Sequence, residues 1–387
     1  MRYSIPFLFL FTLSYQLSAQ AQNRWLIEKS DGRLGMIDST GNEIFTGEFN
    51  SLGEYKNGLA YYRRGAVYNG MEMVKPGERG FLDENGEVAF QYEGWNTFSD
   101  GLVRFQDSVN FYYLNSEGEI ELNLQTLPLP DGKEISDTFY FSDGLAMIRI
   151  KDEGFDDTEY FGSDVTYSED YNLYPGNWFY GFIDKKGQWV VEPTLHSATT
   201  FNDGISIVEC DSGLFFMDTS GSLVTKLSYK YVGDYAEGFA GVYNDDGDFF
   251  INRAGERVGS ASFERIQPFS EGRAAVRIDD KWGFIDTAGQ VVIQPQYYTE
   301  STFTEGLAPV SLEVETQKGD HFIEAFIDRD GSIVIPFKKN IDYGNFNNGI
   351  AKGRRFIHDE NNRYTGYYEL FYIKKNGEKI WSEVLKQ

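Results

Sequence analysis

One short pattern recurs nine times along this chain of 387 residues: an apolar segment, then Asp or a substitute followed three residues later by Gly, then a second apolar segment. From Gly187 to Gly289 the glycine returns every 34 residues. A constant period of this length indicates a chain built from tandem structural repeats. The nine glycines are Gly41, Gly86, Gly118, Gly187, Gly221, Gly255, Gly289, Gly331 and Gly377.

A second pattern lies between successive copies of the first. It consists of an aromatic residue, one variable residue, Asp, Glu or Asn, and then Gly, as in Phe303-Thr304-Glu305-Gly306. In the regular copies its glycine falls 17 residues after the glycine of the first pattern, as Gly204 does after Gly187. The chain is therefore punctuated by two alternating kinds of turn.

We interpret both patterns as type I turns that end in a residue of positive φ. An Asp or Asn side chain caps its own turn, and Gly adopts the left-handed conformation without a Cβ clash. The flanking segments, such as Ala274–Ile278, are short and apolar, as strands are. Each repeat therefore predicts three or four short antiparallel strands that must stack on a neighbour to be stable.

The predicted fold class is all-β, with residues 22–387 forming one domain of about nine units, the last truncated. Aromatic residues make up 17% of the chain and Gly contributes 41 residues, a composition typical of strands joined by tight turns. We expect an open curved stack capped by the incomplete last unit. The alternative is a closed β-propeller, whose blades usually need about 40–50 residues, more than the regular period here.

One stretch carries a specific resemblance. Lys281–Tyr298, with Trp282-Gly283-Phe284-Ile285-Asp286, and the following Phe303–Val310 resemble the WG-repeat family of bacterial β-rich repeat proteins. The resemblance implies a β-rich repeat and no shared catalytic activity, cofactor or ligand. Only Trp282 supplies the Trp of the family; Leu34, Arg79 and Tyr180 stand at that place in other copies.

Residues 1–21 are predicted to be a signal peptide. Arg2 precedes an apolar stretch that begins at Ile5, and Ala19-Gln20-Ala21 provides the small residues that signal peptidase requires. The expected location of the mature protein is secreted or periplasmic. No other stretch is expected to insert into a membrane, and the single cysteine, Cys210, excludes an intrachain disulfide.

The net charge of −25 constrains the partners. Such a charge repels nucleic acid and anionic membrane surfaces, so neither is expected as a partner. A protein or a glycan remains, although the acidic surface is also explained by solubility alone. The oligomeric state stays open.

Extra residues enter mainly at one junction of the repeat, at Arg63–Glu78, Lys151–Tyr180, Glu313–Glu324 and Arg354–Tyr368. Insertions gathered on one face of a repeat protein often mark a binding face. The longest insertion, Lys151–Tyr180, combines carboxylates with aromatic residues, and aromatics contribute large contact areas at binding sites. Its candidate binding residues are Phe155, Tyr160, Phe161, Tyr171, Tyr174 and Trp178. The competing interpretation is that these aromatics pack onto the adjacent repeat.

Catalytic and metal-binding motifs are not evident. His196, His321 and His358 are far apart and lack a nucleophile motif, and Asn244–Asp248 is explained by a hairpin turn rather than a calcium loop. We therefore expect no metal, no cofactor and no enzymatic activity. The predicted function is a secreted or periplasmic binding module whose junction loops engage a protein or a glycan. The alternatives are an extracellular carbohydrate-active hydrolase and a structural envelope component without a discrete site.

Overall fold

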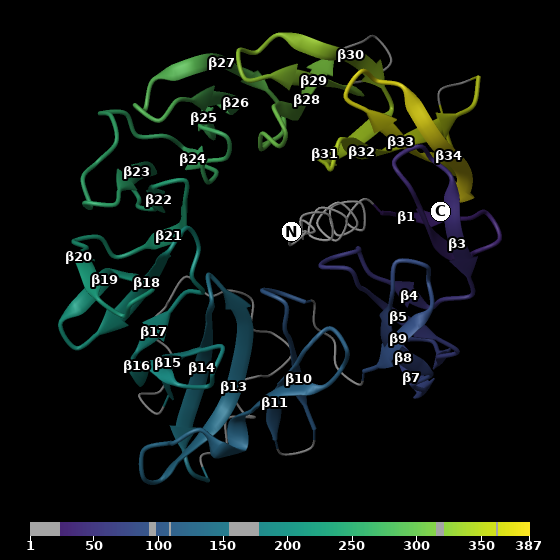
Figure 1. Ribbon diagram of the computed structural model, residues 1–387. Coiled ribbons are helices and arrows are strands. Elements are labelled where there is room, and N and C mark those ends of the chain that lie inside the picture. Colours follow the sequence, from purple (N-terminus) through teal and green to yellow (C-terminus); the bar gives the residue numbers. More distant parts are fainter. Residues whose placement is uncertain (1–23, 93–97, 108–109, 155–177, 315–320, 361–362) are drawn as a thin grey trace, which may run out of the picture. The chain divides into compact units, whose positions relative to one another are not determined.

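The residues that the structure describes form nine small antiparallel sheets and one extra hairpin (Figure 1). The computed structural model describes residues 24–92, 98–107, 110–154, 178–314, 321–360 and 363–387. Each of the nine sheets has three or four strands, and the one helix in these ranges is a single 3-10 turn, η1 (Leu124–Thr126). The prediction of an all-β protein is confirmed. In the same ranges no helix has the length and apolar character needed to cross a membrane.

The chain divides into two compact units. Unit 1 comprises Met1–Thr97 and Gln296–Gln387, and unit 2 comprises Phe98–Pro295. The strands of unit 1 are β1 (Trp25–Glu28), β2 (Leu34–Ile37), β3 (Glu43–Gly47), β4 (Ser51–Leu52), β5 (Ala60–Arg64), β6 (Val67–Asn69), β7 (Glu72–Lys75), β8 (Glu78–Leu82), β9 (Val88–Gln91), β28 (Leu307–Val314), β29 (His321–Asp328), β30 (Ile333–Lys339), β31 (Ile341–Asn347), β32 (Ile350–His358), β33 (Tyr364–Lys374) and β34 (Lys379–Lys386).

Unit 2 is built in the same way, with consecutive strands paired in each sheet. Its strands are β10 (Val103–Gln106), β11 (Phe111–Leu114), β12 (Ile120–Asn123), β13 (Lys133–Ser142), β14 (Leu145–Asp152), β15 (Trp178–Asp184), β16 (Trp189–Leu195), β17 (Ser197–Ala198), β18 (Ile205–Cys210), β19 (Gly213–Asp218), β20 (Leu223–Lys226), β21 (Val232–Ala236), β22 (Phe239–Val242), β23 (Phe249–Asn252), β24 (Arg265–Ile266), β25 (Ala274–Ile278), β26 (Lys281–Ile285) and β27 (Val291–Tyr297).

The first glycine pattern forms the hairpin between the last two strands in eight of the nine described sheets, and in the sheet β21–β23 it follows the last strand. In the copy at Asp286, the Oδ1 atom accepts the backbone N–H groups of Ala288 at 3.0 Å and Gln290 at 2.9 Å. Gly289 has a φ of 77° and donates its N–H to the Asp286 carbonyl. The predicted self-capped turn, closed by a glycine of positive φ, is confirmed.

The second pattern forms a different turn from the one predicted. Asp100 and Gly101 both have positive φ, at 53° and 82°, and Ser99 and Leu102 exchange backbone hydrogen bonds of 2.9 and 3.0 Å. Two successive positive φ values define a two-residue type I′ hairpin, whose twist matches the right-handed twist of the paired strands. The expectation of a type I turn was wrong for this pattern.

The acidic residue of the second pattern serves the next sheet. The Asp100 carboxylate accepts the N–H of Gly144 at 2.7 Å, and the Asp143 carboxylate accepts the N–H of Gly204 at 2.8 Å. In unit 1, Glu305 accepts the N–H of Gly349 at 2.8 Å. These carboxylates therefore link consecutive sheets. The sequence-based prediction that they cap their own turns was wrong for this pattern.

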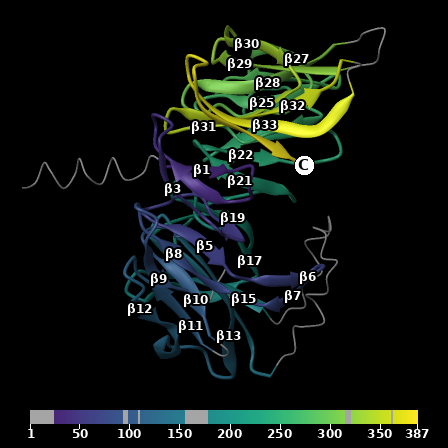
Figure 2. The ribbon, with the colours of Figure 1, turned by 90° about the vertical axis from the view of Figure 1, so that its right-hand side faces the viewer.

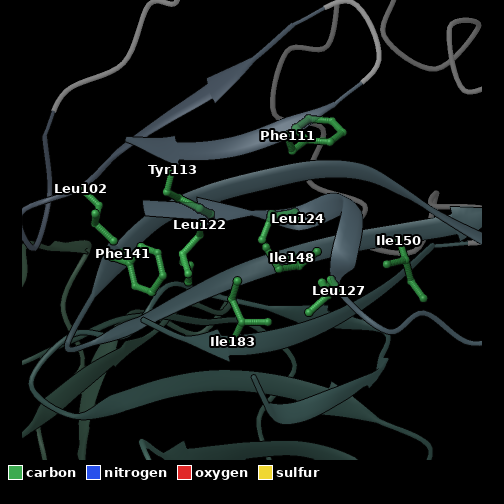
Figure 3. Packing of buried hydrophobic residues seen from close by; sticks show 11 residues of the cluster. Leu102, Phe111, Tyr113, Leu122, Leu124, Leu127, Phe141, Ile148, Ile150 and Ile183 are labelled. Atoms are coloured by element: carbon green, nitrogen blue, oxygen red, sulfur yellow. The ribbon is translucent and has the colours of Figure 1, made fainter. Parts of the chain in front are cut away.

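Apolar side chains fill the space between consecutive sheets. Figure 3 shows one such cluster in unit 2, formed by the sheets β10–β12 and β13–β16. The rings of Tyr113 and Phe141 meet edge to face at 4.8 Å, and Ile148 and Ile183 are fully buried beside them. Burial of each such side chain contributes about 1.5–3 kcal/mol, so stacking rather than isolated sheets provides the stability.

The first and last sheets pack against each other within unit 1 (Figure 1). Trp25 and Ile27 of β1 share a buried cluster with Ile350 and Tyr372 of the last sheet. The Trp25 indole N–H donates to the Asn347 carbonyl at 3.2 Å, and the Tyr372 hydroxyl donates to the Leu26 carbonyl. An open stack would leave these apolar faces in water, which is unfavourable.

The predicted open stack is therefore wrong, and the nine blade-like sheets belong to a β-propeller, the alternative fold. A repeat of 34 residues reaches this fold because its strands are short, often only four to six residues. The last sheet, expected to be truncated, has four strands (β31–β34), whereas the first has three (β1–β3).

Candidate binding site

A hollow of about 930 Å³ lies in unit 2 at one end of the sheet β21–β23. It is found where the hairpin Asn244–Gly247 joins β22 to β23, the junction that carries the insertions in other repeats. We call it the tyrosine groove. Its lining residues are Ser228, Tyr229, Lys230, Tyr231, Val242, Tyr243, Asn244, Asp245, Asp248, Glu264 and Arg265.

Two of the three tyrosines lie side by side on neighbouring chain segments. The Tyr243 N–H donates to the Tyr231 carbonyl at 3.1 Å, which places the two residues opposite each other. A Cβ atom on Gly233 would lie 2.6 Å from the Tyr243 ring, so this ring rests directly on the strand backbone. Tyr243 is 37% exposed and lines the groove.

The other aromatic contacts hold the remaining rings in place. The Tyr229 ring packs edge to face on Phe249 at 5.5 Å. The Lys230 ammonium lies 4.5 Å from the centroid of the Tyr231 ring, a cation–π contact. Rings fixed by such contacts lose little conformational entropy when a ligand binds.

Carboxylates occupy the same groove. Asp248 exchanges two backbone hydrogen bonds of 2.8 Å with Phe263, which fixes its position at the start of β23. Burial raises the pKa of the Asp248 carboxyl above its usual value. Glu264 lies in the segment that leads into β24, 3.8 Å from the Arg277 guanidinium.

Flat aromatic faces beside carboxylates and an arginine suit a ligand with apolar faces and many hydroxyl groups. The C–H faces of a sugar ring pack on tyrosine rings, and its hydroxyls hydrogen-bond to carboxylates and to the tyrosine hydroxyls. The volume falls within the roughly 300–1,000 Å³ typical of small-ligand sites. The groove therefore has the chemistry of a site for a short stretch of glycan.

The acidic hairpin at the groove forms the turn that the sequence predicted. The Asn244 side-chain oxygen accepts the Asp246 N–H at 3.0 Å, and the Gly247 N–H donates to the Asn244 carbonyl at 3.1 Å. Across the described ranges no three His, Cys, Asp or Glu side chains gather closely enough to hold a metal ion.

The predicted loop site falls almost entirely outside the residues that the structure describes. Phe155, Tyr160, Phe161, Tyr171 and Tyr174 belong to the segment 155–177, so their role stays a prediction. Trp178 is described: it begins β15 and is 3% exposed, and the Arg149 guanidinium lies 4.9 Å from its ring centroid.

The described ends of all four junction insertions connect two neighbouring antiparallel strands of one sheet, as the sequence suggested. Three of them join the second and third strands of a four-stranded sheet, and the fourth joins β28 to β29, the first two strands of a three-stranded sheet. The insertion after β5 forms the separate hairpin β6–β7, which projects from its sheet (Figure 2). The prediction that these insertions enter at one junction of the repeat is thus confirmed, whereas their role in binding stays a prediction. The tyrosine groove, at a junction without an insertion, was not predicted. Alignment of the repeats on the glycine of the second pattern would have drawn attention to Tyr231 and Tyr243, where other copies have non-aromatic residues.

Fold and site together define the class of this molecule as a β-propeller repeat protein with a ligand-sized groove between its turns. The chain belongs to the WG-repeat family: its residues 35–68, 180–212, 215–247, 249–282 and 282–313 match the family model described as "WG containing repeat". The tyrosines of the groove lie within the third of these matches. No curated protein sequence matches the chain.

Several solved structures are similar to the chain. The dihydro-heme d1 dehydrogenase NirN in complex with DHE matches 95% of this chain and 74% of its own, with 10% identity and a TM-score of 0.41. The acylaminoacyl peptidase of Pyrococcus horikoshii matches 86% of this chain and 52% of its own, with 9% identity and a TM-score of 0.37. A quinonprotein alcohol dehydrogenase-like protein from Bacteroides thetaiotaomicron matches 84% and 82%, with 10% identity and a TM-score of 0.30. At these scores the similarities support no inference about function.

Proposed function

We propose that this protein is a binding module that holds a glycan in the tyrosine groove. The observation that carries the proposal is the joint presence of Tyr229, Tyr231 and Tyr243 with the Asp248 and Glu264 carboxylates in one hollow of about 930 Å³. Aromatic faces supply contact area, and the carboxylates supply acceptors for sugar hydroxyls.

The charge of the chain narrows the class of glycan. A net charge of −25 and the carboxylates of the groove disfavour polyanionic polysaccharides. Neutral or amino-sugar glycans meet no such repulsion. We further propose that the protein acts outside the cytoplasm, secreted or periplasmic, because residues 1–21 have the pattern of a signal peptide. Fractionation of cells that express the full chain, with N-terminal sequencing of the mature protein, tests this second statement.

Calorimetric titration with neutral oligosaccharides and with chitosan oligosaccharides tests the binding. We expect saturable binding of at least one of these glycans, weakened about tenfold or more by Tyr243→Ala or Tyr231→Ala, because each variant removes a stacking face. Tyr140→Ala is the matched control, since Tyr140 is 50% exposed in the same unit but lies outside the groove. Absence of binding across the panel, or equal weakening by the control, would contradict the proposal.

Hydrolysis of the bound glycan is a second candidate function. It is favoured by the presence of the Asp248 carboxyl, whose pKa is raised by burial, in the same groove as the Glu264 carboxyl, because glycosidases use two carboxyl groups that flank the scissile bond. Release of reducing ends from the bound glycan, abolished by Asp248→Asn with binding retained, would support it. A bound glycan that stays intact during prolonged incubation excludes it.

The loop within Lys151–Tyr180 remains a proposed contact for a protein partner. Deletion of residues 155–177 leaves β14 and β15 in place, because both strands lie outside the deleted segment. We expect this deletion to reduce capture of a partner without changing the melting temperature. Unchanged capture of an identified partner would exclude the loop as its contact.

A further inference from the structure

Unit 1 contains a second hollow of about 450 Å³, formed by β1 of the first sheet and β31, β32 and β33 of the last. We call it the charged pocket. Its lining residues are Glu28, Asp342, Tyr343, Gly344, Lys352, Gly353, Arg354, Tyr368 and Leu370. It carries two carboxylates and two cations, so its formal charge is balanced even though the whole chain is strongly acidic.

Two of the four charges neutralise each other. Asp342 of β31 and Arg354 of β32 are opposite each other in the strand pair. The Arg354 guanidinium donates to the Asp342 carboxylate at 3.0 Å. Both residues line the pocket, so the remaining charges available to a ligand there are Lys352 and Glu28.

Lys352 and Glu28 are both unpaired among the residues that the structure describes. Neither side chain has a hydrogen bond or an ion pair with any of them, although both line the pocket. Removal from bulk water, with a smaller contribution from the adjacent Arg354 charge, lowers the pKa of Lys352, and the Glu28 carboxylate acts in the opposite direction. Burial, with a smaller contribution from the Glu28 charge, raises the pKa of the Tyr368 phenol, and both residues line the pocket.

A ligand with one charge would satisfy only one of these two groups. A ligand that carries both a carboxylate and an ammonium group satisfies both, and opposite charges in a partly desolvated site attract more strongly than they do in water. We propose that the charged pocket binds a small zwitterion of the amino acid or dipeptide class, with its carboxylate at Lys352 and its ammonium group at Glu28. The Tyr368 phenol lies beside them and contributes a hydrogen bond.

Three dipeptide probes separate this proposal from a simple ion site. L-alanyl-L-alanine carries both charges, its N-acetyl derivative carries only the negative charge, and its amide carries only the positive charge. By calorimetry and ligand-observed NMR we expect the free dipeptide to bind about tenfold or more tightly than either derivative. Equal binding of the N-acetyl derivative would show an anion site and overturn the proposal. Absence of dipeptide binding at millimolar concentration would overturn it as well.

Two variants assign the two ends of the ligand. Lys352→Met should weaken the dipeptide about tenfold and leave the amide derivative unchanged, and Glu28→Gln should leave the N-acetyl derivative unchanged. Neither side chain has a hydrogen bond or an ion pair with the described residues that the substitution would remove, so the melting temperature should not move. Lys339→Met, on an exposed lysine outside the pocket, is the matched control. Identical losses for all three probes in either variant would contradict the assignment.

The charged pocket is independent of the proposed glycan site. Tyr243→Ala should leave dipeptide binding intact, and Lys352→Met should leave glycan binding intact. Failure of one proposal is therefore distinguishable from failure of the other.

Discussion

The tyrosine groove and the charged pocket occupy equivalent positions of two repeats. Counted from the second-pattern glycines Gly238 and Gly349, Tyr231 and Asp342 both lie seven residues before, and Tyr243 and Arg354 both lie five residues after. All four side chains line their own hollow. One repeat thus presents two aromatic rings where the other presents an ion pair.

The difference shows that the repeat provides a hollow and leaves its chemistry to a few side chains. Tyr243 covers the backbone at Gly241, where a Cβ atom would lie 3.1 Å from the Tyr243 hydroxyl. In the last repeat the position of Gly241 is occupied by Lys352, whose side chain lines the charged pocket. The strand pairing beneath is the same, since both positions belong to the first hairpin of their sheet.

Other repeats vary at the same two positions. Examples are Asp137 with Arg149, Ser197 with Glu209, Arg265 with Arg277, and Thr299 with Ser311. Each pair is polar, and the members of the first three face each other across their strands. Variation at one face of a constant scaffold is how repeat proteins build binding surfaces.

The largest expected effect comes from breaking the scaffold that both hollows share. Tyr235 and Phe346 lie three residues before their glycines, and they are 4% and 2% exposed. Tyr235→Ala and Phe346→Ala should each lower the free energy of unfolding by about 3–5 kcal/mol, because a large ring leaves a cavity. Denaturant titration measures the loss. A loss below 1 kcal/mol in either repeat would mean that the two scaffolds are not equivalent.

Exchange of the side chains should convert the chemistry without loss of the fold. The double variant Tyr231→Asp with Tyr243→Arg places the ion pair of the charged pocket in the tyrosine groove. We expect glycan affinity to fall about a hundredfold, since two stacking faces are lost, and the melting temperature to change little. Calorimetry and thermal melting report the two quantities. Retained glycan affinity would show that the rings do not carry the binding.

A buried carboxyl should make the charged-pocket repeat sensitive to pH. Glu324 accepts the Tyr343 N–H at 2.7 Å, and burial raises its pKa from 4.5 to about 7. Because the folded state holds this proton more tightly, the stability it contributes is complete below pH 4.5 and is lost as the pH rises through about 7. Glu324→Gln should remove this loss and stabilise the protein at pH 8 by on the order of 2 kcal/mol.

Leu214 stands at the position of Glu324 in the repeat before the tyrosine groove, seven residues ahead of its own glycine. The effect should therefore be confined to the last repeats. Denaturant titrations at pH 5 and pH 8, with the exposed Glu209→Gln as control, measure it. A variant with the same pH dependence as the wild type would contradict it.

The smallest expected effect concerns the ion pair itself. Arg354→Met should lower the free energy of unfolding by less than about 1 kcal/mol, because the pair is half exposed and water screens it. It should nevertheless weaken dipeptide binding, since it leaves the Asp342 carboxylate unpaired beside the ligand. Thermal melting tests the first statement and calorimetry tests the second. A large loss of stability together with unchanged dipeptide binding would contradict both.

Much of the local structure was predictable because it depends on neighbouring residues. The turn at Asp286–Gly289 follows from a side chain that caps its own backbone and from a glycine of positive φ. The type I′ turn at Asp100–Gly101 was not recognised, although Asp-Gly is a strong signal for it. Its carboxylate bonds to Gly144, more than forty residues away, and no local pattern reveals that partner.

The sequence by itself determined the all-β class, the number of repeats and the end of each sheet where extra residues enter, because glycine turns and strand-forming residues act over a few positions. The tertiary structure alone decided that the first and last sheets meet, through Trp25, Ile27 and Tyr372, and which side chains share a hollow. Burial of two apolar faces depends on the sum of many small rotations between sheets, which no single repeat encodes. For the same reason Lys352 and Glu28, separated by most of the chain, became neighbours only when the protein folded.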